Sequence, residues 1–161
     1  MELRLITPGD AEATRRIYNA EVTGSTATFD LRPRSAEEHR RWVEAHLGAH
    51  PAVVAEVDGA VAGFASISPY RSRPAYATTV EDSVYVAGGW RGRGIGAALL
   101  ADVVRRATEH GFHTVLARVE ASNDASVRVH ERCGFAVVGT ERQIGRKFGR
   151  WLDVTVLQKL L

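Results

Sequence analysis

A basic, glycine-rich stretch offers the clearest chemistry in the sequence. It follows the alternating strand pattern Ser83–Val86 and runs directly into an amphipathic helix. Glycine lets backbone N–H groups approach a ligand closely, and a helix N-terminus carries partial positive charge. Such an arrangement binds phosphate groups, and arginines add formal charge to it. The sequence therefore predicts an anion site on Arg91, Gly92, Arg93, Gly94, Ile95, Gly96 and Ala97.

Two common nucleotide-binding arrangements do not fit this stretch. A dinucleotide-binding fingerprint needs its loop after the first strand of a parallel sheet and an acidic residue about 20 residues further on. The strands expected before residue 91 are antiparallel instead. No Gly-Lys-Ser/Thr sequence is present, which disfavours a nucleotide triphosphatase.

Glu81 is the candidate general base. It lies just before the glycine-rich stretch, in a strand that is otherwise apolar or hydroxyl-bearing. Partial burial would raise its pKa toward a useful value. The neighbouring Asp82 would point to the opposite face of a regular strand. Spacing alone favours an exposed carboxylate paired with an arginine over a general base, so both interpretations stay open at this point.

The surrounding elements are predicted from apolar periodicity and from caps and turns. A strand is expected near residues 3–6, a helix at 11–22, and a second helix from the capping box Ser35–Glu38 to Gly48. Strands 52–57, 60–67 and 76–86 follow, the first two joined by the turn Asp58-Gly59. A helix ending at Gly111, a strand at 114–119 and a helix from Asn123 or Asp124 to Gly134 come next. Strands 135–140 and 152–157 end the chain, with a long turn at 143–150 between them.

This order predicts one mixed α/β sheet with helices on both faces. The strands from 52 to 86 should be antiparallel, and strand 114–119 should run parallel to strand 76–86 because a helix connects them. The polar segment 24–29, which ends at Phe29, is either a connecting loop or a substrate-lining loop.

The composition fits one domain spanning residues 1–161. A net charge of +2 with scattered basic residues disfavours a nucleic-acid partner. Cys133 is the single cysteine, so no disulfide can form within the chain. The sequence has no signal-like apolar core and no run long enough for a bilayer. We therefore expect a cytoplasmic protein without a membrane partner.

The segments Val84–Ala97 and Asn123–Phe135 resemble the two signatures of the GNAT superfamily of N-acetyltransferases; the first signature is written Q/R-x-x-G-x-G/A. The chain is more narrowly similar to phosphinothricin and methionine sulfoximine N-acetyltransferases. The matching segments are Tyr18-Asn19, Ser25–Phe29, Thr79–Val86, His130-Glu131 and Lys147–Asp153. These segments are distributed over nearly the whole length of the chain.

The resemblance implies the GNAT acyl-CoA N-acyltransferase fold, a mixed, mostly antiparallel sheet flanked by helices, in which two parallel strands splay apart. It implies acetyl-CoA as co-substrate and no metal. The pantetheine arm would bind the strand at Val84, Tyr85 and Val86, and the pyrophosphate would bind residues 91 to 97. Asn123 and Ser126 would contact the arm, although Asn123 also fits a plain helix N-cap.

The resemblance also implies catalytic roles. Glu81 would take a proton from the amine, directly or through water, and the Val84 region would stabilise the oxyanion through backbone N–H groups. His130 stands where many superfamily members carry a tyrosine, a departure shared with the narrower subfamily, and is the candidate acid for the departing thiolate. A histidine that only packs and hydrogen-bonds is the alternative for His130, and Tyr85 competes for the acid role.

The acceptor would lie beside Arg71 and Arg73, because an arginine fork matches a carboxylate. Ala75, Tyr76 and Phe29 would complete its pocket, although two arginines in one loop are often only a solvated turn. The segment Lys147–Trp151 is similar to one that reaches across a homodimer interface.

The expected reaction is acetylation of the α-amine of methionine sulfoximine, methionine sulfone or phosphinothricin. The alternatives are a protein N-terminus or a polyamine as acceptor, or a CoA-binding module without catalysis.

Overall fold

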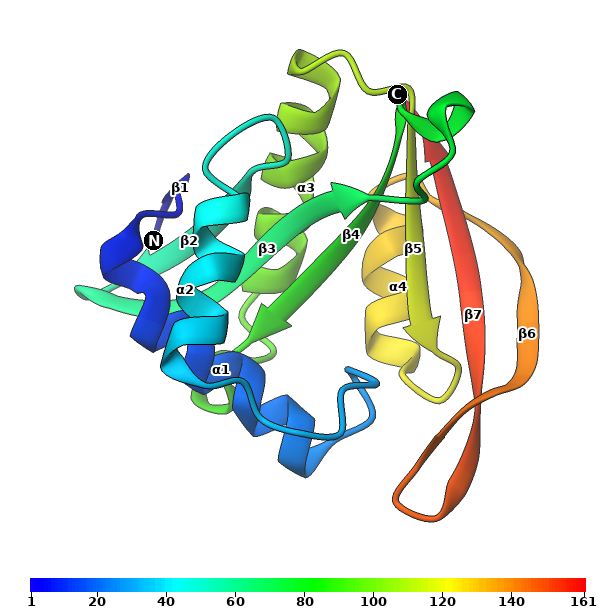
Figure 1. Ribbon diagram of the computed structural model, residues 1–161, viewed down its shortest axis with the longest axis horizontal. Helices are drawn as coiled ribbons and strands as arrows, with labels where there is room; N and C mark the ends of the chain where they lie inside the picture. Colours follow the sequence, from blue (N-terminus) through cyan, green and yellow to red (C-terminus); the bar gives the residue numbers. More distant parts are fainter.

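The computed structural model describes residues 1–161 and contains a seven-stranded sheet in the order β1-β2-β3-β4-β5-β7-β6 (Figure 1). The strands are β1 (Glu2–Leu5), β2 (Ala52–Val57), β3 (Ala60–Pro69), β4 (Thr79–Val86), β5 (Thr114–Glu120), β6 (Ala136–Lys147) and β7 (Arg150–Leu160). All neighbouring strands are antiparallel except β4 and β5, which are parallel. The expected mixed, mostly antiparallel sheet is confirmed.

Four α-helices cover the two faces of this sheet (Figure 1). They are α1 (Ala11–Gly24), α2 (Ala36–Ala45), α3 (Ile95–Glu109) and α4 (Asp124–Arg132). Helices α1 and α2 lie on one face, while α3 and α4 lie on the other. None of these helices combines the length and the apolar character needed to cross a bilayer.

Local sequence features explain where several elements begin and end. Ser35 and Glu38 form the expected reciprocal capping box at the start of α2. Asp58 and Gly59 have φ angles of 51° and 76°, as a tight hairpin turn between β2 and β3 requires. Helix α3 starts directly after Gly94, which takes a φ of 79° that glycine adopts without strain.

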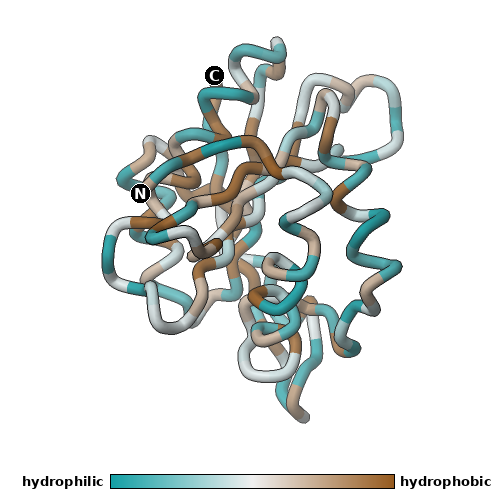
Figure 2. Tube along the Cα trace, turned by 90° about the vertical axis from the view of Figure 1, so that its left-hand side faces the viewer, coloured by the Kyte–Doolittle hydropathy of each residue, from teal (hydrophilic) through white to brown (hydrophobic).

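Two apolar cores lie on the two faces of the sheet. The larger packs α3 against β2–β5, with Leu99, Leu100 and Val103 completely buried. The smaller packs α1 and α2 against β2 and β3, around Val22, Val43 and Phe64. Figure 2 shows the hydrophobic segments gathered along the central strands and the hydrophilic ones on the outer turns. This double-sided burial holds the central strands β3, β4 and β5 in place.

The parallel pair β4–β5 is joined over only three residue pairs. Thr79, Val80 and Glu81 pair with Thr114, Val115 and Leu116, and no pairing continues beyond them. On its other side β4 stays paired with β3 up to Val86. The last part of β4 therefore presents an unpaired backbone edge to the gap between the two strands, which confirms the expected splayed pair.

Two boundary predictions were wrong. The strand expected at 76–86 begins only at Thr79, because Pro74–Tyr76 forms a 3-10 turn; proline presets the backbone for such a turn. The long turn expected at 143–150 is instead strand β6 up to Lys147, followed by a tight turn at Phe148 and Gly149 with φ angles of 52° and 71°. Strand β6 is an irregular edge strand with two register shifts, so its apolar alternation is lost.

Candidate active site

A groove of about 470 Å³ runs between the end of β4, the glycine-rich loop and helix α4. It is lined by Val84, Val86, Trp90, Arg91, Gly92, Gly94, Ile95, Gly96, Ala97, Ala125, Ser126, Arg128, Val129, His130 and Arg132. Most of the residues predicted to bind a cofactor are therefore brought together on one surface. The groove joins the anion-site loop to the splayed strand pair.

The loop end of the groove is rich in free backbone donors. Gly92 and Gly94 have φ angles of 74° and 79°. No side chain caps α3, so the N–H groups of Ile95, Gly96 and Ala97 lack helical partners. A side chain at Gly96 would meet Val86, whose nearest atom lies 3.6 Å from the position of a Cβ. The loop thus fits a pyrophosphate group, because it combines free N–H donors, space for the ligand to approach the backbone closely, and the positive end of a helix dipole.

The open edge of β4 carries the backbone groups of Val84 and Val86. The amide of Ala87 donates to Ala62 of β3 at 2.9 Å, so by alternation the amides and carbonyls of Val84 and Val86 face away from β3. The Nε of Arg91 donates to the carbonyl of Val86 at 3.1 Å, and the Arg91 guanidinium also binds Glu21 of α1. Arg91 therefore covers Val86 while the Val84 edge stays open.

Three of the predicted cofactor residues lie outside the groove. Tyr85 points to the face of β4 opposite to the groove. There it packs on Tyr18, and burial raises the pKa of its phenol. The guanidinium of Arg93 lies 5.0 Å from the ring centroid of Trp90. Asn123 caps α4 by accepting a hydrogen bond from the Ser126 amide at 3.1 Å. The N-cap alternative for Asn123 is thus realised in the structure.

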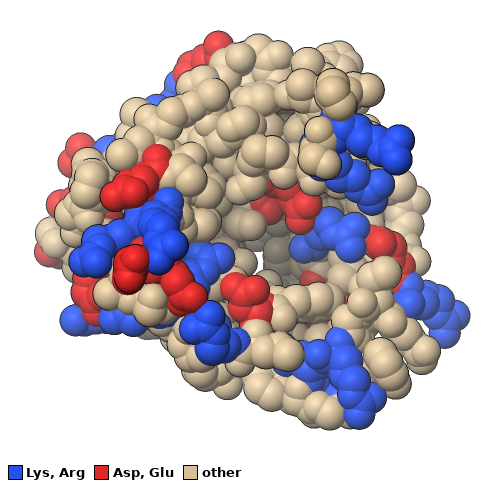
Figure 3. Space-filling view, in the orientation of Figure 1, with Lys and Arg blue, Asp and Glu red and all other residues tan.

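A smaller cavity of about 60 Å³ lies within the splay itself. It is lined by Ala27, Asp82, Ser83, Val84, Tyr85, Arg118, Val119, Glu120, Asn123, Ser126 and His130. Val84, Ser126 and His130 belong to this cavity and to the groove, so the two are neighbours. In Figure 3 the surface is hollowed beside β4 and β5, with acidic and basic side chains bordering the hollow.

His130 is held at this junction by hydrogen bonds at both ring nitrogens, including a 3.5 Å contact between Nδ1 and the Ser126 hydroxyl. Its Nδ1 contacts the carbonyl of Ser126 at 2.8 Å, and its Nε2 contacts Oδ1 of Asp82 at 3.2 Å. Both side chains are at least 96% buried. Burial lowers the pKa of His130, but the hydrogen bond and charge of Asp82 and the Ser126 carbonyl outweigh it, so the net pKa is raised. Burial also raises the pKa of Asp82.

Glu81 lies on the other face of β4, with Ser83 and Tyr85, and is half-buried. Burial raises the pKa of its carboxyl group; the charge of Arg118 opposes this rise, while Asp82 and Glu141 add to it. Arg118 itself forms an ion pair with Glu141 at 2.5 Å. A carboxylate with a raised pKa and His130 therefore stand on opposite faces of the same strand, one on each side of the splay.

The family model for the acetyltransferase (GNAT) family matches residues 13–135, a span that includes the groove, the splay and α4. The chain belongs to the GNAT acetyltransferase family. Its enzyme class is therefore acyltransferase, and the resemblance found in the sequence is confirmed.

Two relatives match this GNAT chain over nearly its full length. The phosphinothricin N-acetyltransferase of Streptomyces coelicolor is 40% identical over 97% of the chain and 95% of its own length. The L-methionine sulfoximine/L-methionine sulfone acetyltransferase of Salmonella typhimurium is 38% identical over 98% of the chain and 93% of its own length.

Two solved structures share the GNAT fold with the chain. A ribosomal-protein-alanine N-acetyltransferase from Brucella melitensis has a TM-score of 0.98 and 39% identity, covering all of both chains. A putative acetyltransferase from Salmonella typhimurium, solved with its cofactor acetyl-CoA, has a TM-score of 0.97 and 37% identity. It covers all of this chain, which covers 94% of it.

The predicted acceptor residues of this GNAT protein do not meet in one cavity. Arg71, Arg73 and Ala75 are exposed on the β3–β4 loop, and the Arg71 guanidinium lies 4.8 Å from the ring centroid of Tyr70. Neither these residues nor Tyr76 line the groove or the splay cavity. Phe29 packs on Gly145 of β6, away from Arg71 and Arg73 in the fold.

Sequence reasoning missed several residues that the structure places at the site. Arg128 and Arg132 line the groove from α4, beside Trp90 from the loop. Their i, i+4 spacing places both arginines on one helix face, and this pattern would have revealed them. No local pattern marks Asp82 as the partner of His130, because 48 residues separate the two.

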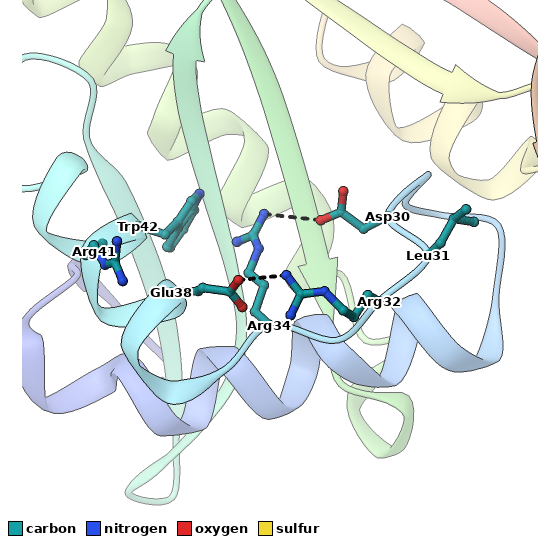
Figure 4. A pocket seen from close by; sticks show the side chains of 7 residues that line it. All are labelled: Asp30, Leu31, Arg32, Arg34, Glu38, Arg41 and Trp42. Atoms are coloured by element: carbon teal, nitrogen blue, oxygen red, sulfur yellow. Dashed lines mark hydrogen bonds and ion pairs between the residues drawn. The ribbon is translucent and has the colours of Figure 1, made fainter.

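Another cavity, of about 660 Å³, lies between α2 and the α1–α2 loop (Figure 4). Its charged side chains pair with one another or with near neighbours. Arg32 binds Glu38 at 2.8 Å, and Arg34 lies 3.7 Å from Asp30. Because these charges are already matched, this cavity is a weaker site candidate than the smaller groove.

Proposed function

We propose that the protein transfers an acetyl group from acetyl-CoA to the α-amine of a small amino-acid analogue, with methionine sulfoximine, methionine sulfone and phosphinothricin as the named acceptors. The observation that carries the proposal is the continuity of the groove, which leads from unpaired N–H groups at the start of α3 to the open edge of β4. The names of the relatives support both the acceptor class and the co-substrate.

In this proposal each end of the co-substrate meets a different part of the groove. The N–H groups at residues 92 to 97 bind the pyrophosphate, and the open edge at Val84 binds the pantetheine arm as an added strand would. When bound, acetyl-CoA supplies the activated acyl group. Arg91 must leave the Val86 carbonyl if the arm is to bond there, since its guanidinium now occupies that position.

Glu81 acts as the general base in the proposed reaction. The acceptor is an ammonium in water and must lose a proton before it can attack the thioester carbonyl. Burial raises the pKa of the Glu81 carboxyl group, which makes the carboxylate a stronger base. The Val84 amide stabilises the oxyanion, and His130 supplies the proton that the leaving thiolate takes.

Arg71 and Arg73 bind the acceptor's carboxylate in this proposal, with Phe29, Ala75 and Tyr76 beside its side chain. Both arginines are exposed, and neither guanidinium forms an ion pair with a carboxylate of the protein. This supports a role toward a ligand. Because these residues do not share a cavity with the groove, the acceptor must bridge the splay, or the β3–β4 loop must close on it.

The Brucella neighbour's name favours a second candidate, the α-amine of a protein N-terminus. A peptide acceptor has no carboxylate beside the reacting amine, whereas a free amino acid does. A polyamine has no carboxylate at all. These acceptors therefore differ in the feature that the two arginines would recognise.

A thiol-release assay across matched amines tests the proposal. The panel holds methionine sulfoximine, methionine sulfone, phosphinothricin, a short peptide with N-terminal alanine, and spermidine. We expect the free amino-acid analogues to have the highest kcat/KM. A preference for the peptide or for spermidine would replace the proposed acceptor, and no turnover with any amine would favour a CoA-binding module.

We also propose a homodimer that forms through the β6–β7 hairpin, in which residues 1–161 act as one domain. Val138, Ile144, Phe148 and Trp151 are each more than half exposed on this hairpin, and an apolar edge of this kind is an interaction surface. Size-exclusion chromatography with light scattering tests it: Trp151→Lys should shift the protein to a monomer. A wild-type protein that is monomeric at micromolar concentration would contradict the proposal.

The proposed compartment is the cytoplasm. Cys133 is a free, half-buried thiol, which is typical of a reducing environment. Fluorescence microscopy of a tagged protein in its own cell checks this placement.

A further inference from the structure

Asp82 and His130 form a buried side-chain contact, of which the proposed reaction uses only the histidine. Oδ1 of Asp82 contacts His130, while Oδ2 is buried without any hydrogen-bond partner. The His130 ring also packs edge-on against Phe135, with the centroids 5.1 Å apart. The ring is therefore fixed on three sides, and the carboxylate has no competing donor.

The hydrogen-bond partners of His130 determine how many protons the pair holds. The Ser126 carbonyl only accepts hydrogen bonds, so Nδ1 must carry a hydrogen to use the 2.8 Å contact. A neutral ring would then turn the lone pair of Nε2 toward the carboxylate of Asp82, which repels it. Both contacts are favourable only when a second proton lies between Nε2 and Oδ1.

We infer that Asp82 is a positioning residue that keeps this second proton on the pair, so that the Asp82–His130 pair, rather than a lone histidine, protonates the leaving thiolate. This inference rests on the proposed acetyl transfer. It is favoured by location, because Asp82 and His130 both line the cavity within the splay.

The proton balance of the reaction agrees with this role. The acceptor ammonium loses two protons overall when it becomes an amide. As the C–S bond breaks, its electron pair stays on sulfur, and the pair gives its proton to that sulfur. One ammonium proton then reloads the pair through solvent or Glu81, and the other is released to water.

Other titratable groups around the pair are few. Glu81 is its neighbour on β4, with its side chain on the opposite face of the strand. Cys133 follows α4, and the charge of Asp82 contributes to the raised pKa of its thiol. Arg118 and Glu120 of β5 line the same cavity. Neither hydrogen-bonds to the pair. Burial lowers the pKa of His130, and the hydrogen bond and charge of Asp82 are the main influences that raise it.

Asp82→Asn tests the inference because it keeps the shape and removes the negative charge. An amide donates to Nε2, which leaves His130 neutral with a hydrogen on Nδ1 alone. We expect ¹⁵N NMR to show two ring protons in the wild type at neutral pH and one in the variant. We expect kcat to fall about 100-fold or more, as for the loss of a general acid, while KM for acetyl-CoA changes little.

The pH profile gives an independent readout. Activity that needs a protonated acid is lost as the pH rises through its pKa. Removing the negative charge of Asp82 should lower the pKa of His130 and so move this alkaline limb to lower pH by about one unit or more. A double-mutant cycle with His130→Gln should show no further loss from Asp82→Asn, because Asp82 acts through the histidine.

Asp58→Asn is the matched control, since Asp58 lies in an exposed turn that tolerates asparagine. If Asp82→Asn does not fold, Asp82→Ser removes the same charge with a smaller side chain. An active enzyme whose alkaline limb and ring protons are the same in the variant would overturn the inference. A wild type that acetylates no amine would refute the proposed function, and the NMR signals alone would then decide whether the pair shares a proton.

Discussion

At the scale of single residues, the alternation of β4 separates two proton-transfer groups. Glu81 and Asp82 are adjacent in sequence and point to opposite faces of the strand. Glu81 shares its face with Ser83 and Tyr85 and has a raised pKa, while Asp82 faces His130 on the side of the groove. The proposed base and the proposed acid thus stand on the two sides of the splayed strand pair.

Replacing Glu81 by glutamine should remove the base. We expect kcat/KM to fall about 100-fold or more at neutral pH, within the usual range for general-base catalysis. The wild-type rate should rise with pH through the raised pKa of Glu81, because only the ionised carboxylate accepts the proton. Thiol release measured from pH 5 to 9 checks both. Glu37→Gln, at an exposed ion pair with Arg41, serves as control, and full activity of Glu81→Gln would disprove the assignment.

The Arg71→Ala/Arg73→Ala double variant should weaken the binding of acceptors that carry a carboxylate. A charged hydrogen-bonded pair contributes about 1.5–3 kcal/mol, so KM should rise about tenfold or more. Decarboxylated analogues of the same amines should show no change. Steady-state kinetics on both sets of acceptors measures this, with Arg32→Ala as a surface control. An unchanged KM for the amino acids would contradict the proposed carboxylate binding by the two arginines.

At the scale of elements, the α1–α2 loop is held between α1 and the β6–β7 hairpin. The hydroxyl of Tyr18 hydrogen-bonds with that of Thr28 at 2.8 Å, and Nζ of Lys147 donates to the Thr28 carbonyl at 2.8 Å. Phe29 fills the space above Gly145. The hairpin therefore holds the α1–α2 loop in place, even though it belongs to the far edge of the sheet.

Gly145→Ala tests this attachment. A Cβ at position 145 would overlap the ring of Phe29, so the loop or the hairpin must move. We expect a loss of about 1–3 kcal/mol in the free energy of unfolding, as for other overpacked contacts. Urea denaturation measures it. Gly139→Ala lies on the same strand with open space around it; an equal loss there would show that the effect is not the Phe29 contact.

At the scale of the whole molecule, the core of α1 and α2 encloses a neutral histidine. His39 is fully buried, its Nε2 contacts Oγ1 of Thr14 at 2.9 Å, and its Nδ1 has no partner. Burial, with the charges of Arg34 and Arg15, lowers the pKa of His39 to about 4. Protonation would place an unpaired cation between the sheet and two helices. The folded state therefore disfavours protonation of His39.

The stability of the protein should therefore fall as the pH drops from about 6.5 to about 4. In that window His39 is protonated in the unfolded chain but stays neutral in the folded chain. The free energy of unfolding should therefore fall by about 3 kcal/mol across the window. Urea denaturation at several pH values checks this. His39→Gln keeps a donor for Thr14 and should flatten most of the slope, whereas His110→Gln, at an exposed position, should not. A pH-independent wild type would contradict the prediction.

Much of the fold could be predicted because its determinants are local. The capping box at Ser35, the turn at Asp58-Gly59 and the glycine-rich loop before α3 depend on backbone preferences of a few neighbouring residues. The family signatures also lie in continuous segments. The same reasoning failed at β6, where an irregular edge strand exposes both faces and loses the alternation that marks a strand.

By itself, the sequence determined the GNAT family and the order of most elements, and it predicted an anion site in the glycine-rich loop. Only the tertiary structure decided which side chains meet across long stretches of chain. It brings Asp82 to His130, Arg91 to the Val86 carbonyl and Phe29 to Gly145. It also leaves Arg71 and Arg73 outside the groove. The physical reason is that backbone preferences act over a few residues, whereas side-chain partners depend on how distant strands and helices pack.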